Sequence, residues 1–234
     1  MDVVELLPRL YLLRFPVGQA YLWCDADELT LVDAGPAGSG AAVAAVAEPL
    51  GTIRRIVLTH FHEDHVGGAG ELAALTGAEV VAHHLDAPAI RGEVPGPPPV
   101  FEDWELPIHA EAARRLPEAP FVRPSLITEV TDGDVLGFGN GAHVLHTPGH
   151  TDGSIAVHLP RRRVLFTGDT VAASPVDGGV MPGVFNLHRP RLLASLHRLA
   201  SLDCDVACFG HGDPVVGQAG TVLRRTADRH PVRP

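Results

Sequence analysis

The first third of the chain alternates short apolar runs with turn residues, which is the pattern of β-strands in a layered protein. Clusters such as Pro16-Val17-Gly18 and Asp25-Ala26-Asp27 separate the runs. The pattern predicts strands over Val3–Leu7, Leu10–Phe15, Ala20–Cys24 and Leu29–Val32.

Helix and strand patterns then alternate. Ser39 stands in the position of an N-cap before an Ala-rich stretch. The predicted elements are a helix over Gly40–Leu50, a strand over Ile53–Leu58, a helix over about Ala69–Leu75 and a strand over Val80–Ala82. This strand–helix–strand order predicts a sheet covered by helices.

Strand patterns return in the second half of the chain, over Ile127–Val130, His143–His146, Ser154–Leu159, Val164–Thr167 and Val206–Phe209. Pro190 opens a helix whose predicted apolar stripe is Leu193, Leu196, His197 and Ala200. A final helix is predicted over about Gln218–Asp228. Strands on both sides of a central helical region predict an α+β fold with two sheets and helices outside them.

The segment over residues 85–124 has little strand pattern, and residues 92–99 carry four prolines. We predict an irregular or partly helical insertion. Long connections of this kind are often lids or binding loops, so Phe101 and Trp104 are candidates for apolar contact with a substrate. The alternative is an external insertion packed away from the site.

Length and composition restrict the function. The 234 residues are 45% hydrophobic and 20% charged, which fits one globular domain over 1–234. The net charge of −10 argues against a nucleic-acid or anionic-membrane partner. All 18 basic residues are Arg, which excludes a catalytic lysine. The N-terminus has no signal-peptide pattern, so we predict a cytoplasmic protein.

Three cysteines, Cys24, Cys204 and Cys208, are too few for a disulfide framework. The spacing of Cys204 and Cys208 allows a metal site, but no second pair completes four ligands. We therefore expect buried free thiols.

Histidine is abundant, with 14 residues, and three lie close together after a predicted strand. The segment Thr59-His60-Phe61-His62-Glu63-Asp64-His65 is followed by Gly67 and Gly68, which permit tight backbone approach. Imidazole and carboxylate groups suit zinc and other first-row metals. His60 and His62 can turn toward one ion, and Asp64 and His65 toward a second position. This spacing favours a metal site over a polar loop.

Three more polar residues follow apolar strands later in the chain. His150 lies on a Pro-Gly turn, Asp169 follows Thr167-Gly168, and His211 lies between two glycines. Each alone is a weak signal. Together they supply a second set of His, Asp and His at strand ends, where α/β sheets usually hold their sites.

With these residues in view, the sequence resembles the metallo-β-lactamase superfamily, whose pattern is HxHxDH followed by a distant His, Asp and His. The resemblance covers nearly the whole chain and implies a four-layer αββα sandwich. It implies that His60, His62 and His150 hold a first metal, that Asp64, His65 and His211 hold a second, and that Asp169 bridges them. It also implies that Asp33 lies behind the site and orients ligands.

The resemblance implies two Zn²⁺ ions, with iron or manganese as alternatives, and hydrolysis by a metal-bridging hydroxide. The catalytic residues would be Asp64, which steers the hydroxide, and Asp169. We expect a small ester, thioester or lactone as substrate, because features of other sub-families are missing. A tyrosine typical of homoserine-lactone lactonases is Ala172 here, and only 23 residues follow His211, too few for the C-terminal domain of glyoxalase II.

Three alternatives stay open at this point. Persulfide dioxygenases, which use one iron held by two His and an Asp, also resemble this sequence. A β-lactamase is a further alternative, although Asp169 disfavours it. The last is a metal-binding module without turnover, against which the complete ligand set argues. His83 and His84 are weaker candidates for lining the site, whereas we expect structural roles for His197 and His230.

Overall fold

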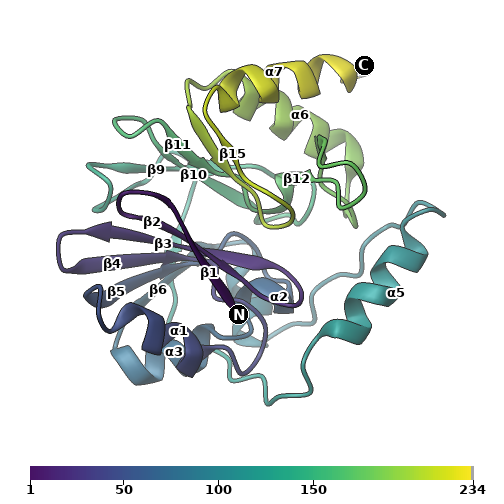
Figure 1. Ribbon diagram of the computed structural model, residues 1–234. Helices are drawn as coiled ribbons and strands as arrows, with labels where there is room; N and C mark the ends of the chain where they lie inside the picture. The colour runs from purple at the N-terminus through teal and green to yellow at the C-terminus, as the bar shows by residue number, and fades with distance from the viewer. Residues whose placement is uncertain (233–234) are drawn as a thin grey trace. The chain divides into compact units, whose positions relative to one another are not determined.

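The computed structural model describes residues 1–232, which divide into two compact units. Unit 1 consists of Met1–Gly96 and Ala110–Val130, and unit 2 of Pro97–His109 and the chain from Thr131 onward. Both units combine a sheet with helices, as the α+β prediction requires (Figure 1).

Unit 1 is built on a seven-stranded sheet in the order β1-β2-β3-β4-β5-β6-β7. Its strands are β1 (Asp2–Leu7), β2 (Leu10–Arg14), β3 (Gln19–Asp25), β4 (Glu28–Val32), β5 (Thr52–Val57), β6 (Glu79–His83) and β7 (Thr128–Val130). The first four strands are antiparallel, and β4 to β7 are parallel. Parallel neighbours need crossover connections, and helices fill those connections here.

The crossover helices of unit 1 are α1 (Gly40–Ala47), the short α2 (Glu63–Val66) and α3 (Ala69–Thr76). Helices α1 and α3 lie together on one face of the sheet (Figure 1). Val43 of α1 and Leu72 of α3 are buried there with Leu31 of β4 and Ile56 of β5. The apolar strand runs read from the sequence therefore form the core of this unit.

Ser39 does precede α1, but it does not cap it in the predicted way. Its hydroxyl donates to the carbonyl oxygens of Ala34 and Pro36, each at 2.7 Å, and makes no bond to the first turn of the helix. Glu71 of α3 accepts from the backbone N–H groups of Gly40 and Ala41 instead. A partner distant in sequence thus supplies the acceptors that the helix start needs.

Unit 2 holds a six-stranded sheet in the order β15-β14-β11-β10-β9-β8 and a two-stranded sheet of β12 and β13. The strands are β8 (Val135–Leu136), β9 (Ala142–His146), β10 (Ile155–Leu159), β11 (Val164–Phe166), β12 (Val171–Ala173), β13 (Val180–Pro182), β14 (Val206–Cys208) and β15 (Val215–Val216). A 3₁₀ turn, η1 (Gly168–Thr170), lies before β12. Strands β11 and β14 pair in parallel, and the other neighbours are antiparallel.

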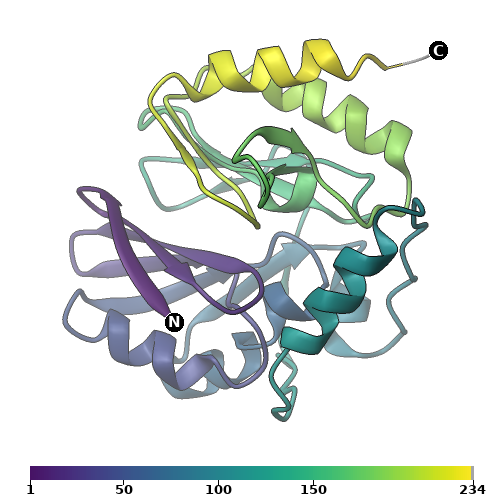
Figure 2. The same cartoon turned by 45° about the vertical axis from the view of Figure 1, so that its right-hand side comes forward.

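Helices α6 (Arg189–Ala200) and α7 (Ala219–Arg229) lie side by side on one face of the larger sheet of unit 2 (Figure 2). The prediction of which α6 residues face the core was partly wrong. Leu196 and Ala200 are buried, but Leu193 and His197 are only half-buried, and Leu192 and Leu199 are buried in their place. The core-facing stripe is therefore rotated by about one position. His197 lies at its margin, where its Nε2 donates to the carbonyl of His230.

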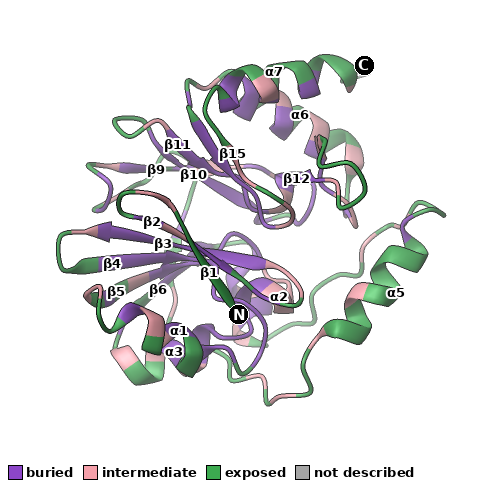
Figure 3. Ribbon diagram, viewed as in Figure 1, coloured by how far each residue is buried: buried purple, intermediate pink, exposed green. Residues whose placement is uncertain are grey.

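The insertion over residues 85–124 is partly helical. It holds two helices, α4 (Ala87–Arg91) and α5 (Leu106–Arg115), the second of which has no buried residue (Figure 3). Arg123 donates to the carbonyl oxygens of Ala89 and Ile90 and so ties the end of the segment to α4.

The three cysteines are free and buried, as predicted. Burial raises the pKa of the Cys204 thiol to about 11, so this thiol stays protonated at neutral pH. Within residues 1–232 no helix has the length and apolar character needed to cross a bilayer.

Candidate functional site

Four of the predicted site residues lie in unit 1, directly after the end of β5. His60 and His62 belong to the loop, and Asp64 and His65 to helix α2. His60 Nε2 lies 3.1 Å from His62 Nδ1, and His65 Nε2 lies 3.4 Å from Asp64 Oδ2. The rings of His60 and His65 have centroids 4.2 Å apart. The four side chains therefore form one cluster.

Asp33 supports this cluster from behind. It follows β4 and has a φ of +60°, a left-handed conformation that Asp tolerates better than most residues. Its carboxylate accepts from Thr59 N at 2.8 Å, from Thr59 Oγ1 at 2.9 Å and from His65 Nδ1 at 2.8 Å. The ring of His65 is thus fixed with Nδ1 as the donor.

Thr59 orients a second histidine. Its hydroxyl hydrogen is used in the bond to Asp33, so Thr59 Oγ1 accepts from His60 Nδ1, 3.0 Å away. His60 and His65 therefore both carry their proton on Nδ1 and keep the lone pair of Nε2 for a ligand. This role of Thr59 was not apparent from the sequence.

The glycine pair after the histidines permits close packing, as predicted. A Cβ on Gly67 would collide with the backbone N of Ala37, and one on Gly68 with Ser39 Oγ and the carbonyl oxygen of Ala34. Both glycines have ordinary negative φ values. Close approach, and not an unusual backbone conformation, is therefore what requires Gly here.

The other three predicted residues form a cluster in unit 2. His150 lies on the loop after β9, Asp169 in η1, and His211 on the loop after β14. His150 Nε2 lies 3.5 Å from Asp169 Oδ2, and His211 Nε2 lies 3.2 Å from the same oxygen. His150 is buried, whereas the His211 side chain is 36% exposed. Two imidazoles thus converge on one carboxylate oxygen.

Asn186 orients His150, and no sequence pattern pointed to this residue. Asn186 is buried, its Nδ2 donates to Gly183 O at 2.8 Å, and its Oδ1 accepts from His150 Nδ1 at 3.3 Å. The backbone of the loop that carries Asn186 also contacts His150, since Leu187 N donates to His150 O at 3.1 Å. His150 therefore joins His60 and His65 in having Nδ1 beside an oxygen acceptor, which leaves Nε2 as a possible ligand atom.

The donor set of the two clusters suits a divalent metal. Each of the seven side chains offers one nitrogen or oxygen ligand atom. Three of the five imidazoles have Nδ1 bound to an oxygen acceptor, which is the arrangement typical of metal-ligating histidines. Imidazole and carboxylate together fit zinc and also iron or manganese.

His83 and His84 lie where β6 ends in unit 1. His83 is buried at the end of β6, its Nδ1 accepts from Leu85 N at 3.3 Å, and its ring packs on that of His84. His84 donates its backbone N–H to Val130 O. The bond of His84 ties the end of β6 to the end of β7.

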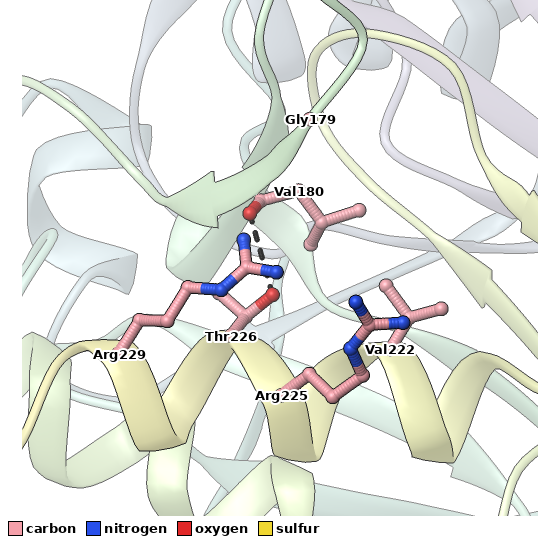
Figure 4. A pocket seen from close by; sticks show the side chains of 6 residues that line it. All are labelled: Gly179, Val180, Val222, Arg225, Thr226 and Arg229. Atoms are coloured by element: carbon pink, nitrogen blue, oxygen red, sulfur yellow. Dashed lines mark hydrogen bonds between the residues drawn. The ribbon is translucent and has the colours of Figure 1, made fainter.

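A hollow of about 180 Å³ lies elsewhere in unit 2, between α7 and the start of β13 (Figure 4). Arg225 and Arg229 flank it, and Thr226 at its base donates to Val180 O. None of the seven predicted ligands lines this hollow.

Comparisons with known proteins identify relatives of this chain. Residues 13–211 match the family model described as "Metallo-beta-lactamase superfamily". The hydroxyacylglutathione hydrolase of Maricaulis maris (strain MCS10) is 35% identical over 180 residues, which cover 76% of this chain and 56% of that enzyme. The chain therefore matches little more than half the length of that relative.

Two solved structures share the fold. A metallo-beta-lactamase family protein from Thermus thermophilus is 28% identical with a TM-score of 0.68, over 96% of this chain and 79% of that one. The protein TTHA1623, solved in a di-iron-bound form, is 26% identical with a TM-score of 0.63, over 97% of this chain and 98% of that one. These likenesses confirm the predicted fold class.

Proposed function

This chain belongs to the metallo-beta-lactamase superfamily, and we propose that it is a metal-dependent hydrolase of a small acyl thioester, with esters and lactones as related substrates. The proposal depends on one observation above all. His60, His65 and His150 each have Nδ1 bonded to an oxygen acceptor, which leaves Nε2 to serve as the ligand atom that we propose. Histidines that serve only in packing have no need of this shared orientation.

We further propose that the two clusters together hold two metal ions. The first would be held by His60, His62 and His150, and the second by Asp64, His65 and His211. Asp169 would contact both, because a carboxylate can offer one oxygen to each ion. Zinc is the leading metal, and the di-iron form of TTHA1623 supports iron as the alternative.

Metal ions in such a site would lower the pKa of water toward neutrality and polarise the substrate carbonyl. The residues of the chain supply the rest of the chemistry. Asp64, partly exposed on α2, would orient the attacking water and take its proton. Asp33 would keep His65 in one tautomer throughout the cycle.

A thioester is the leading substrate because the relative from Maricaulis maris is named a hydroxyacylglutathione hydrolase, and an acylglutathione is a thioester. This chain has no lysine, so we propose a recognition of the thiol part of the substrate that does not use lysine.

The test is a substrate panel measured with metal-free and zinc-reconstituted protein. Acylglutathione, acyl-coenzyme A, an aryl ester, a lactone and glutathione persulfide would each be offered at equal concentration. We expect thiol release from a thioester that disappears on metal removal and returns on adding zinc. Hydrolysis that survives complete metal removal would contradict the proposal. Oxygen consumption on the persulfide, without hydrolysis of any ester, would identify a dioxygenase instead.

A further inference from the structure

Glu105 is a buried carboxylate in the part of the insertion that belongs to unit 2. Its side chain is 2% exposed, and full burial of Glu is rare unless the charge is satisfied. Its Oε2 accepts from Glu102 N at 3.0 Å, and its Oε1 accepts from Phe185 N at 3.1 Å. The carboxylate thus joins the start of α5 to a loop 80 residues further along the chain.

The loop that Glu105 holds is the one that orients His150. Phe185 has a φ of +59°, a strained conformation for an aromatic residue that needs support from its surroundings. The next residue is Asn186, whose Oδ1 accepts from His150 Nδ1. Val100 N also donates to Asn186 O at 2.9 Å. Two hydrogen bonds from the insertion therefore act on the loop at adjacent residues.

Aromatic packing reinforces this contact. The Phe101 ring lies 5.9 Å from that of Phe185, and His109 lies 4.7 Å from Phe101 and 5.2 Å from Phe185, measured between centroids. Phe101 and Phe185 are half-buried, whereas His109 is exposed. Two rings and a buried carboxylate of the insertion therefore contact this loop.

We propose that Glu105 is a positioning residue for His150: it fixes Phe185 in its strained conformation, and thereby places Asn186 so that His150 keeps Nε2 available as a metal ligand. The inference rests on the proposed function, because it assumes that His150 binds a metal. It assigns the insertion a role in building the site, in addition to any role in covering it.

The experiment measures zinc affinity by competition with a chromophoric chelator, in wild type and in Glu105→Ala, Asn186→Ala and the double variant. We expect Glu105→Ala and Asn186→Ala each to weaken one of the two zinc sites by about tenfold, the size typical of losing a group behind a ligand. If Glu105 acts through Asn186, the double variant should lose no more than the worse single variant.

Two further variants make the test specific. Glu105→Gln keeps an oxygen for Phe185 N but presents an amide N–H₂ group to Glu102 N, so zinc affinity should fall between those of Glu105→Ala and wild type. Glu105→Gln also tests the proposal if Glu105→Ala does not fold. The control is Glu111→Ala, an exposed carboxylate on α5 paired with Arg114 and Arg115, for which wild-type zinc affinity is expected.

Zinc affinity unchanged in both Glu105 variants would overturn the inference, and so would losses that add in full in the double variant. Either result would leave the proposed function intact, because wild type would still bind zinc. A wild-type protein that binds no zinc or other metal would overturn the proposed function and this inference with it.

Discussion

Asp33 Oδ2 lies 2.8 Å from His65 Nδ1, and both side chains are almost wholly buried. The same carboxylate accepts two bonds from Thr59, so one residue fixes the loop that carries the first cluster. Buried donors cost free energy when their acceptor is lost, so this pair stabilises the fold of unit 1.

Asp33→Ala should therefore lower the free energy of unfolding of the metal-free protein by about 3 kcal/mol, because three buried donors lose their acceptor. Asp33→Asn should cost less, since Asn tolerates a positive φ and keeps one acceptor oxygen. Urea denaturation of the metal-free variants measures both. A loss below about 0.5 kcal/mol for Asp33→Ala would mean that the bonds to Thr59 and His65 contribute nothing.

Asp169→Ala should reduce turnover on the order of a hundredfold or more, as expected for losing a major electrostatic element. Metal content should fall while the melting temperature of the metal-free protein changes little. Asp152→Ala is the matched control, because this carboxylate is exposed and pairs only loosely with Arg191. Normal turnover with full metal content in Asp169→Ala would contradict the proposed contact of Asp169 with both ions.

The two aromatic residues of the insertion that were suggested for substrate contact, Phe101 and Trp104, have different surroundings. Phe101 packs against Phe185 near the His150 loop, whereas Trp104 is 44% exposed and its indole N–H donates to Glu102 Oε2. Phe101→Ala should change the ratio of kcat/KM between short and long acyl chains by about tenfold, the effect of one or two lost apolar contacts. Trp104→Ala should leave that ratio within about twofold. The reverse order would show that the exposed face of the insertion contacts the substrate.

His158 makes stability depend on pH. It is buried in β10, its Nε2 donates to Asp203 O at 3.2 Å, and burial lowers its pKa from the usual value, with the neighbouring His143 acting in the same direction. A histidine with a lowered folded-state pKa takes up its proton first in the unfolded chain. Its stabilising effect is therefore complete above about pH 6.5 and declines as the pH falls below that value.

His158→Gln should accordingly flatten the decline in the free energy of unfolding between about pH 7 and pH 5. The control is His84→Gln, which replaces an exposed histidine of unit 1 and should keep the wild-type slope. Denaturant titrations across this range measure the slope. An unchanged slope in His158→Gln would assign the acid sensitivity to other groups.

Apolar runs bounded by turn residues could be predicted from the sequence, whereas several of the shortest strands could not. The apolar runs of β3, β4 and β5 and the helices α1 and α3 were found where the structure has them. Strands β8, β12, β13 and β15 span two or three residues each, which is too short for any alternation to appear. Their pairing depends on neighbours distant in sequence.

The same distinction applies to the candidate site. His60, His62, Asp64 and His65 lie within six positions, so local spacing alone was enough to bring them into one cluster. Residues that orient the candidate ligands could not be found from local spacing. Asn186 lies 36 residues from His150, and only the folded loop brings them together.

The metal content of protein purified without chelator is the most direct test of the central proposal. Elemental analysis should find close to two equivalents of metal per chain, because seven His and Asp ligand atoms exceed what one tetrahedral or octahedral ion uses. Thiol release from a thioester should rise in proportion as metal is restored to the stripped protein. One tightly held iron per chain, or full activity without metal, would contradict the account.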